Sequence, residues 1–135
     1  MAGRSAYAPW MLGVLRIITG LIFLEHGSAK LLGFPPAGEG QAVNPPLMSL
    51  MGIGGILELV GGSLIALGLF TRPVAFVLAG EMAVAYWMFH APQGPFPLSN
   101  GGDAAILYCF VFLYLVFAGP GRPALDEFVG RRRRR

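Results

Sequence analysis

Eight ionisable side chains of this sequence lie within, or at the edge of, long apolar stretches. They are Arg16, Glu25, His26, Lys30, Glu58, Glu81, His90 and Asp103. A charged side chain at the centre of a membrane span costs about 2.5–3.5 kcal/mol. Such residues usually form ion pairs, transfer protons or contact a polar ligand, so they are the first candidates for a functional site.

Four of these residues lie on the same side of the predicted membrane spans: His26, Lys30, His90 and Asp103. Histidines and carboxylates can bind a metal ion, but their spacing matches no standard motif and we predict no metal site. Two interpretations remain. The four residues form either an opening that transfers protons or attracts anions, or a structural polar network. Cys109 is the single cysteine, so redox chemistry would need a bound cofactor rather than an internal dithiol.

The composition indicates that a lipid bilayer surrounds these stretches. Hydrophobic residues make up 55% of the 135 residues and charged residues 13%, with a mean hydropathy of +0.63; soluble domains carry roughly a quarter charged residues. A membrane-spanning helix needs about 20 mainly apolar residues. We therefore predict an all-α, polytopic membrane four-helix bundle, forming one domain over residues 1–135, with helices at about 10–32, 47–70, 73–91 and 102–118.

The positions of the cations predict the orientation of the chain. Gly33–Pro46 and Pro92–Gly101, the predicted first and third loops, contain no Lys or Arg. The opposite side carries Arg4, Arg72 and Arg122. The positive-inside rule then places both termini in the cytoplasm, in a multi-pass protein of the cell (inner) membrane.

Residues 122–135 form a basic tail on this cytoplasmic side. Five of the ten cations of the chain are in the run Arg131–Arg135. A nucleic-acid-binding face would spread its cations over a folded surface, so we predict no nucleic-acid partner. The tail either fixes the topology or also contacts anionic lipid headgroups.

Helical geometry separates the ionisable groups by face and by depth. At 100° per residue, Arg16 and Lys30 lie on one face of the first predicted helix and Glu25 lies on the opposite face. Counted along the spans, Glu58 and Glu81 lie near the midplane. We predict an Arg16–Glu81 ion pair inside the bundle, with Arg16–Glu58 as the second choice.

Glu58 is surrounded by glycines on its own helical face. Gly54, Gly55, Gly61 and Gly62 are three or four residues away from it. Small residues let neighbouring helices approach closely. The pattern indicates either a tight helix crossing held by one carboxyl hydrogen bond, or the floor of a cleft in which a ligand meets Glu58.

The fourth predicted helix carries an aromatic stripe. Asp103, Phe110, Tyr114 and Phe117 align on one of its faces. The stripe could flank a quinone ring, or it could belong to the helix-packing core.

Taken together, these segments resemble the DoxX family of small four-helix membrane proteins from about Leu15 to Asp126. The resemblance rests on H-G-S-A-K-L at His26–Leu31 and on E-L-V-G-G-S-L-I-A-L-G-L-F-T-R at Glu58–Arg72. It rests also on N-G-G-D-A-A-I-L-Y at Asn100–Tyr108 and G-P-G-R-P-A-L-D at Gly119–Asp126. Asp103 departs from the pattern, which favours Glu there.

The resemblance implies a fold more firmly than an activity, and it transfers no catalytic residue. Relatives include a subunit of thiosulfate:quinone oxidoreductase, membrane partners of soluble redox enzymes, and eukaryotic assembly chaperones. It suggests a redox-linked or quinone-interacting accessory subunit, with quinone as cofactor and a soluble redox enzyme or a second copy of the chain as partner. A non-enzymatic scaffold or assembly factor, and a pathway for small solutes or protons, are the alternatives.

Overall fold

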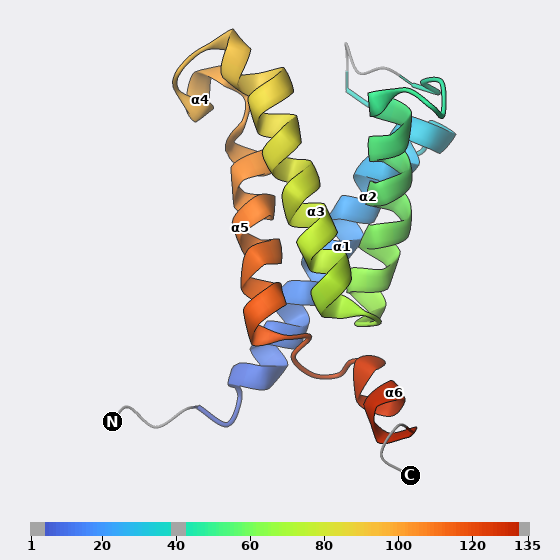
Figure 1. Cartoon of the computed structure of the whole chain (residues 1–135), viewed down its shortest axis with the longest axis vertical. Coiled ribbons are helices and arrows are strands. Elements are labelled where there is room, and N and C mark those ends of the chain that lie inside the picture. Colours follow the sequence, from blue (N-terminus) through green and yellow to red (C-terminus); the bar gives the residue numbers. More distant parts are fainter. Residues whose placement is uncertain (1–4, 39–42, 133–135) are drawn as a thin grey trace. The chain divides into compact units, whose positions relative to one another are not determined.

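Every regular element in residues 5–38 and 43–132, which the computed structural model describes, is a helix. The α-helices are α1 (Ala8–Leu32), α2 (Leu50–Leu67), α3 (Thr71–Ala85), α4 (Pro97–Asn100), α5 (Asp103–Ala118) and α6 (Asp126–Arg132) (Figure 1). A π-helical turn, η1 (Tyr86–His90), and a 3₁₀ turn, η2 (Ala91–Gln93), follow α3. The predicted all-α membrane fold is confirmed.

Three helical stretches in the described residues are long and apolar enough to cross a membrane. They are Ala8–Leu32, Leu50–Leu67 and Thr71–Gln93. The apolar helix α5 has only 16 residues, or about 24 Å at 1.5 Å per residue, against a hydrocarbon core of about 30 Å. The four-helix count therefore stays a prediction.

Local capping explains why α2 is shorter than the predicted 47–70. The hydroxyl of Ser49 accepts a hydrogen bond from the N–H of Gly52 at 3.1 Å, which fixes the first turn. Gly68 has a φ of 69°, a left-handed conformation that ends helices and that glycine adopts without strain. Serine and glycine thus set both ends of the helix inside the longer apolar stretch.

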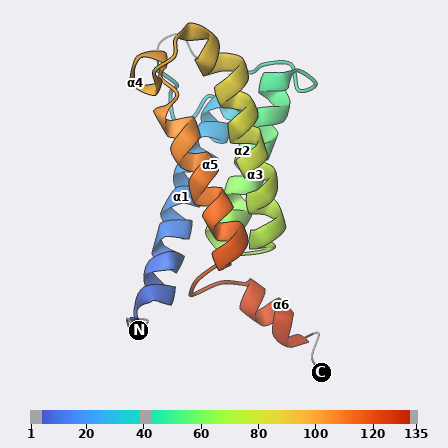
Figure 2. The same cartoon turned by 60° about the vertical axis from the view of Figure 1, so that its left-hand side comes forward.

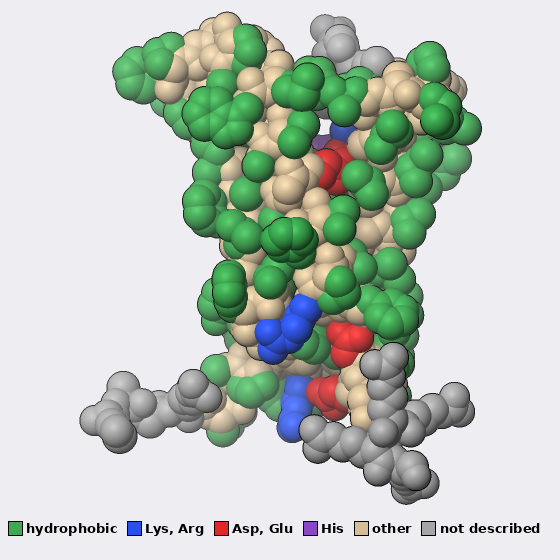
Figure 3. All heavy atoms as spheres, in the orientation of Figure 1, with side chains coloured by type: hydrophobic (Ala, Val, Ile, Leu, Met, Phe, Trp, Pro, Cys, Tyr) green, Lys and Arg blue, Asp and Glu red, His purple; other side chains and the backbone are tan. Residues whose placement is uncertain are grey.

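Many side chains on the surface of the helices are apolar, as contact with lipid requires. In Figure 3, hydrophobic side chains are spread over the visible face, and charged side chains are confined to a few places. Exposed large side chains on the long helices include Ile18 and Leu21 of α1, Val60 of α2 and Phe76 of α3. Exposure of this extent on long apolar helices is what contact with lipid requires.

The chain divides into two compact units, Met1–Thr71 with Pro120–Arg135, and Arg72–Gly119. In the first unit, α1 packs along α2 (Figures 1 and 2). A Cβ atom placed on Gly20 would lie 2.5 Å from the backbone nitrogen of Ala66, and one on Gly62 would lie 2.5 Å from that of Leu24. The two backbones are therefore so close that only glycine fits at these positions.

In the second unit, Arg72 and Asn100 make the main polar contacts. Nη1 of Arg72 donates to the carbonyls of Val116 and Phe117 at 2.6 and 2.9 Å, at the C-terminus of α5. The buried Asn100 donates from its side chain to Gly94 at 2.8 Å and accepts from the N–H of Gly102, also at 2.8 Å. Asn100 thus holds the turn before α5, whose N-cap residue is Gly102.

Gly62→Ala should lower the free energy of unfolding by about 1–3 kcal/mol, because the added methyl group meets the backbone of α1. Gly80→Ala is the matched control, since a Cβ there meets no described atom within 4 Å. Alanine also favours a helix over glycine by up to about 1 kcal/mol, so the control should be neutral or stabilising. Thermal unfolding of the full chain in mild detergent compares the two, and equal losses would contradict the tight crossing.

Candidate functional site

Lys30 and Glu58 form an ion pair between α1 and α2. Nζ of Lys30 lies 2.7 Å from Oε1 of Glu58, and the side chains are 21% and 5% exposed. Gly27, one turn before Lys30, has no side chain to separate the helices here, and a Cβ on it would lie 2.9 Å from the carbonyl carbon of Glu58. The close crossing therefore brings a cation of α1 onto the glycine-flanked carboxylate of α2.

The second carboxylate oxygen of this pair is not satisfied. Oε2 of Glu58 is buried and has no hydrogen-bond partner among the described residues. A buried acceptor without a partner costs about 1–3 kcal/mol, so native proteins rarely leave one without a reason. The pair therefore combines an ammonium donor with a buried acceptor that a ligand, a water molecule or a proton can satisfy.

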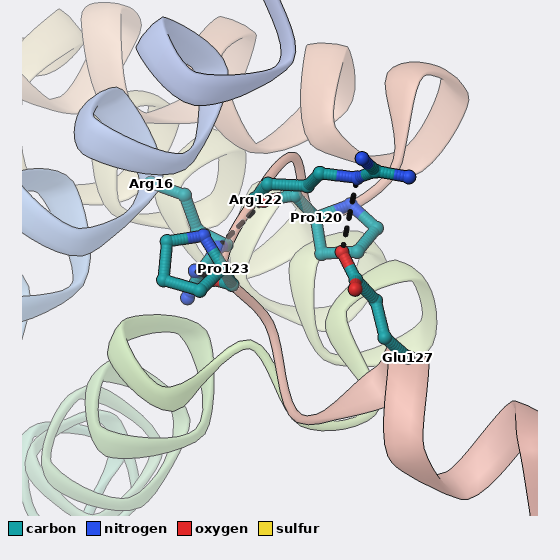
Figure 4. Close-up of polar contacts among 5 residues, drawn as sticks. All are labelled: Arg16, Pro120, Arg122, Pro123 and Glu127. Atoms are coloured by element: carbon teal, nitrogen blue, oxygen red, sulfur yellow. Dashed lines mark hydrogen bonds and ion pairs between the residues drawn. The ribbon is translucent and has the colours of Figure 1, made fainter.

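Arg16, which is 1% exposed, donates its hydrogen bonds to backbone carbonyls (Figure 4). Its Nε donates to Pro120 at 2.7 Å, its Nη1 donates to Ile65 and Ala66 at 2.6 Å each, and its Nη2 donates to Pro123. The carbonyls of Ile65 and Ala66 are in the last turn of α2, where the helix dipole is negative. Helix-end carbonyls thus replace the water that this charge would otherwise need.

Asp126 holds the turn between α2 and α3. Its carboxylate accepts from the N–H groups of Phe70 and Thr71 at 2.7 and 2.9 Å. The backbone N–H groups of Leu125 and Asp126 donate to the carbonyls at the end of α2 at 3.2 and 2.9 Å. The segment from Pro120 to Asp126 therefore completes the end of α2, the start of α3 and the shell around Arg16.

The predicted Arg16–Glu58 ion pair is wrong, because Glu58 accepts from Lys30. Within the first unit, the guanidinium of Arg16 makes four hydrogen bonds, all to backbone carbonyls. The predicted Arg16–Glu81 ion pair joins residues of the two units and stays a prediction. The register of the crossing is the reason that Arg16 does not pair with Glu58. Arg16 lies opposite the last turn of α2, and Lys30, about 21 Å further along α1, lies opposite Glu58.

The remaining predicted residues are distributed over both units. Glu25 and His26 are exposed on α1, Glu81 is half-buried on α3, and Asp103 is the exposed first residue of α5. His90 ends η1, with its Nδ1 3.0 Å from the carbonyl of Asn100. No three His, Cys, Asp or Glu residues of the described part of the chain could hold a metal ion together. The joint site of His26, Lys30, His90 and Asp103 draws on both units and stays a prediction.

The glycines and the aromatic stripe have different environments. A Cβ on Gly55 would lie 3.0 Å from the Leu31 side chain of α1; Gly61 is buried and Gly54 is half-buried. By contrast, Phe110, Tyr114 and Phe117 are 56–79% exposed on α5. The interpretation of this stripe as core is therefore wrong.

Sequence reasoning missed two polar residues that organise the helix ends. Asp126 and Arg72 both lie outside the apolar stretches, so they are not among the eight ionisable residues expected inside the membrane. The signal was present in the segments G-P-G-R-P-A-L-D and L-F-T-R, which end at these two residues. A motif of turn residues and a charge at a predicted helix end is the pattern that indicates them.

The helices, the exposed apolar surface and the buried polar pair define a polytopic membrane protein. The sequence model of the DoxX family matches residues 11–91, and the chain belongs to this family. This confirms the resemblance noted in the sequence. The match covers α1, α2 and α3, and with them Arg16, Lys30 and Glu58.

Several proteins of other organisms are similar to this chain over most of their length. An uncharacterized protein of Haemophilus influenzae is 46% identical over 133 residues, covering 94% of this chain and 96% of that protein. The inner membrane protein YphA of Escherichia coli is 32% identical, over 91% and 93%. The putative oxidoreductase CatD of Bacillus subtilis is 30% identical, over 86% and 84%. No solved structure matches the chain.

Arg16→Lys should lower the free energy of unfolding by about 3 kcal/mol or more, because hydrogen bonds to a charged group contribute about 1.5–3 kcal/mol each and a lysine cannot reach four carbonyls. Arg72→Lys is the control, since Arg72 is exposed and its contacts should be worth about 1 kcal/mol or less. Unfolding of the full chain in detergent measures both. A loss at Arg16 no larger than that at Arg72 would contradict the role given to the carbonyl shell.

Proposed function

We propose that this DoxX-family protein is a redox-linked accessory subunit of the inner membrane that binds a quinone at the Lys30–Glu58 pair. The observation that carries the proposal is the buried Oε2 of Glu58, which lacks a hydrogen-bond partner in the described residues although Oε1 accepts from Lys30. A redox subunit needs a place in the membrane where an electron carrier can exchange protons. Glu58 and Lys30 supply the groups for it.

The donor and acceptor of the pair fit the polar groups of a quinone and its reduced form. A quinone carbonyl can accept from Nζ of Lys30, and a hydroquinone hydroxyl can also donate to Oε2 of Glu58. When bound, the quinone would supply the two-electron chemistry that the single Cys109 cannot. Glu58 would accept a hydrogen bond from a hydroquinone hydroxyl, and Lys30 would hold the carboxylate in position for it.

Two observations favour a redox role over the scaffold alternative. The similarity to the putative oxidoreductase CatD favours a redox role over a purely structural one. A scaffold would need glycine faces that are open to other proteins, but Gly55 and Gly62 lie against Leu31 and Leu24 of this chain. That use of the glycines leaves the scaffold function without its main sequence support.

We further propose that both termini are cytoplasmic, as the loops without cations favour, and that the membrane is the inner one, as for the relative YphA. Gly38 lies in the first of those loops. In a Cys109→Ala background, Gly38→Cys should react with a membrane-impermeant maleimide from the outer side only. Labelling from the cytoplasm alone would reverse the orientation.

The full chain in lipid nanodiscs should bind a short-chain benzohydroquinone saturably. Glu58→Gln and Lys30→Met should each weaken binding about tenfold or more, since a lost hydrogen bond to a charged group costs about 1.5–3 kcal/mol. Equilibrium dialysis measures the dissociation constant. Glu25→Gln is the matched control. It removes an exposed carboxylate from α1, the helix that carries Lys30, and should leave binding unchanged.

Two results would count against this function. The absence of saturable binding by the folded wild-type chain would remove the quinone from the proposal. Equal binding by the wild-type chain, Glu58→Gln and Lys30→Met, with each variant unfolding cooperatively, would show that a quinone binds elsewhere.

A further inference from the structure

We propose that the segment from Leu125 to the C-terminus is a membrane-surface clamp that binds anionic lipid headgroups. It would act on the leaflet at which α2 ends. This inference concerns a different part of the molecule from the Lys30–Glu58 pair and does not depend on quinone binding. Its support comes from where α6 begins, which side chains α6 exposes, and how the charges of the segment are engaged.

The start of α6 is fixed at the end of a membrane-crossing helix. The Asp126 carboxylate accepts from the N–H groups of Phe70 and Thr71, and the Asp126 N–H donates to the carbonyl of Gly68 at 2.9 Å. These residues form the turn after Leu67, where the apolar helix α2 ends. A turn between two spans must lie at the membrane–water interface, so α6 begins there as well.

The side chains of α6 and of the residue before it present an apolar face at this level. Leu125, Phe128 and Val129 are 40%, 65% and 39% exposed. Their spacing of three and four residues puts them on one side of a helix. Figure 2 shows α6 continuing beyond the end of α2. Three exposed apolar side chains at the interface are suited to shallow insertion among lipid headgroups.

The charges of the segment leave a cationic excess in the sequence that follows these apolar residues. Asp126 is engaged by two backbone N–H groups, and Oε1 of Glu127 lies 3.5 Å from Nε of Arg122 (Figure 4). The run Arg131–Arg135 follows in the sequence with no acidic residue among its members. Clusters of cations beside a membrane-anchored segment are attracted to anionic lipids. Apolar and cationic residues together indicate a lipid surface rather than a soluble polyanion.

The experiment uses the full chain with Gly130→Cys in a Cys109→Ala background, labelled with bimane. A Cβ at Gly130 meets no described atom within 4 Å, so the label should not disturb the fold. The labelled protein is placed in nanodiscs of phosphatidylcholine alone, or with a third of phosphatidylglycerol, each carrying a headgroup nitroxide quencher. Gly38→Cys, an equally open glycine outside the C-terminal segment, is the control position.

Quenching at position 130 should rise about twofold or more on adding the anionic lipid, and 0.5 M salt should reverse the rise because it screens the attraction. Replacing all five residues Arg131–Arg135 by glutamine should abolish it, and Phe128→Ser should reduce it. Quenching at position 38 should not change. Quenching that is equal in both membranes, or unaffected by the glutamine replacement in a chain that still unfolds cooperatively, would overturn the proposal.

Discussion

The close approach of α1 and α2 is the constraint on which the first unit depends. Gly20 and Gly62 bring the two backbones to a separation at which a Cβ would overlap the opposite main chain. At this separation Lys30 reaches Glu58, and Arg16 reaches the carbonyls of Ile65 and Ala66. The cations of α1 are thus satisfied by a carboxylate in one place and by the negative end of a helix in the other, which is how charged groups can remain inside an apolar bundle.

Backbone groups at helix ends satisfy three of the charged side chains: Arg16, Arg72 and Asp126. Arg16 binds the last turn of α2, and Arg72 binds the last turn of α5. Asp126 binds the N–H groups at the start of α3. In each case the charge has the sign that the helix dipole favours. Against this background the Lys30–Glu58 pair is different, since it joins two side chains and leaves Oε2 of Glu58 without a hydrogen bond among the described residues. That difference is why the proposed ligand site is placed there.

The sequence was sufficient for the class of fold and for the family, because long apolar stretches and turn residues are local signals. It was also sufficient to single out Arg16, Lys30 and Glu58 as polar residues inside the membrane. Their partners could not be predicted, because pairing depends on the register between two helices, and helical angles give the face of a residue but not its opposite neighbour. Backbone carbonyls carry no sequence signature at all, so the shell around Arg16 was out of reach. Asp126 lay in a recognisable motif and was missed only because it is outside the apolar stretches.

The register of the crossing and the proposed ligand site both require the Lys30–Glu58 pair. A double-mutant cycle with Lys30→Met and Glu58→Gln, measured as the free energy of unfolding of the full chain in detergent, tests the pair directly. Removing one partner strands a buried charge and should cost about 3–5 kcal/mol, and the double variant should cost far less than the sum of the single variants. A coupling of about 2 kcal/mol or more is the predicted result. Strictly additive losses would contradict it, because they would mean that Lys30 and Glu58 do not interact in the folded protein.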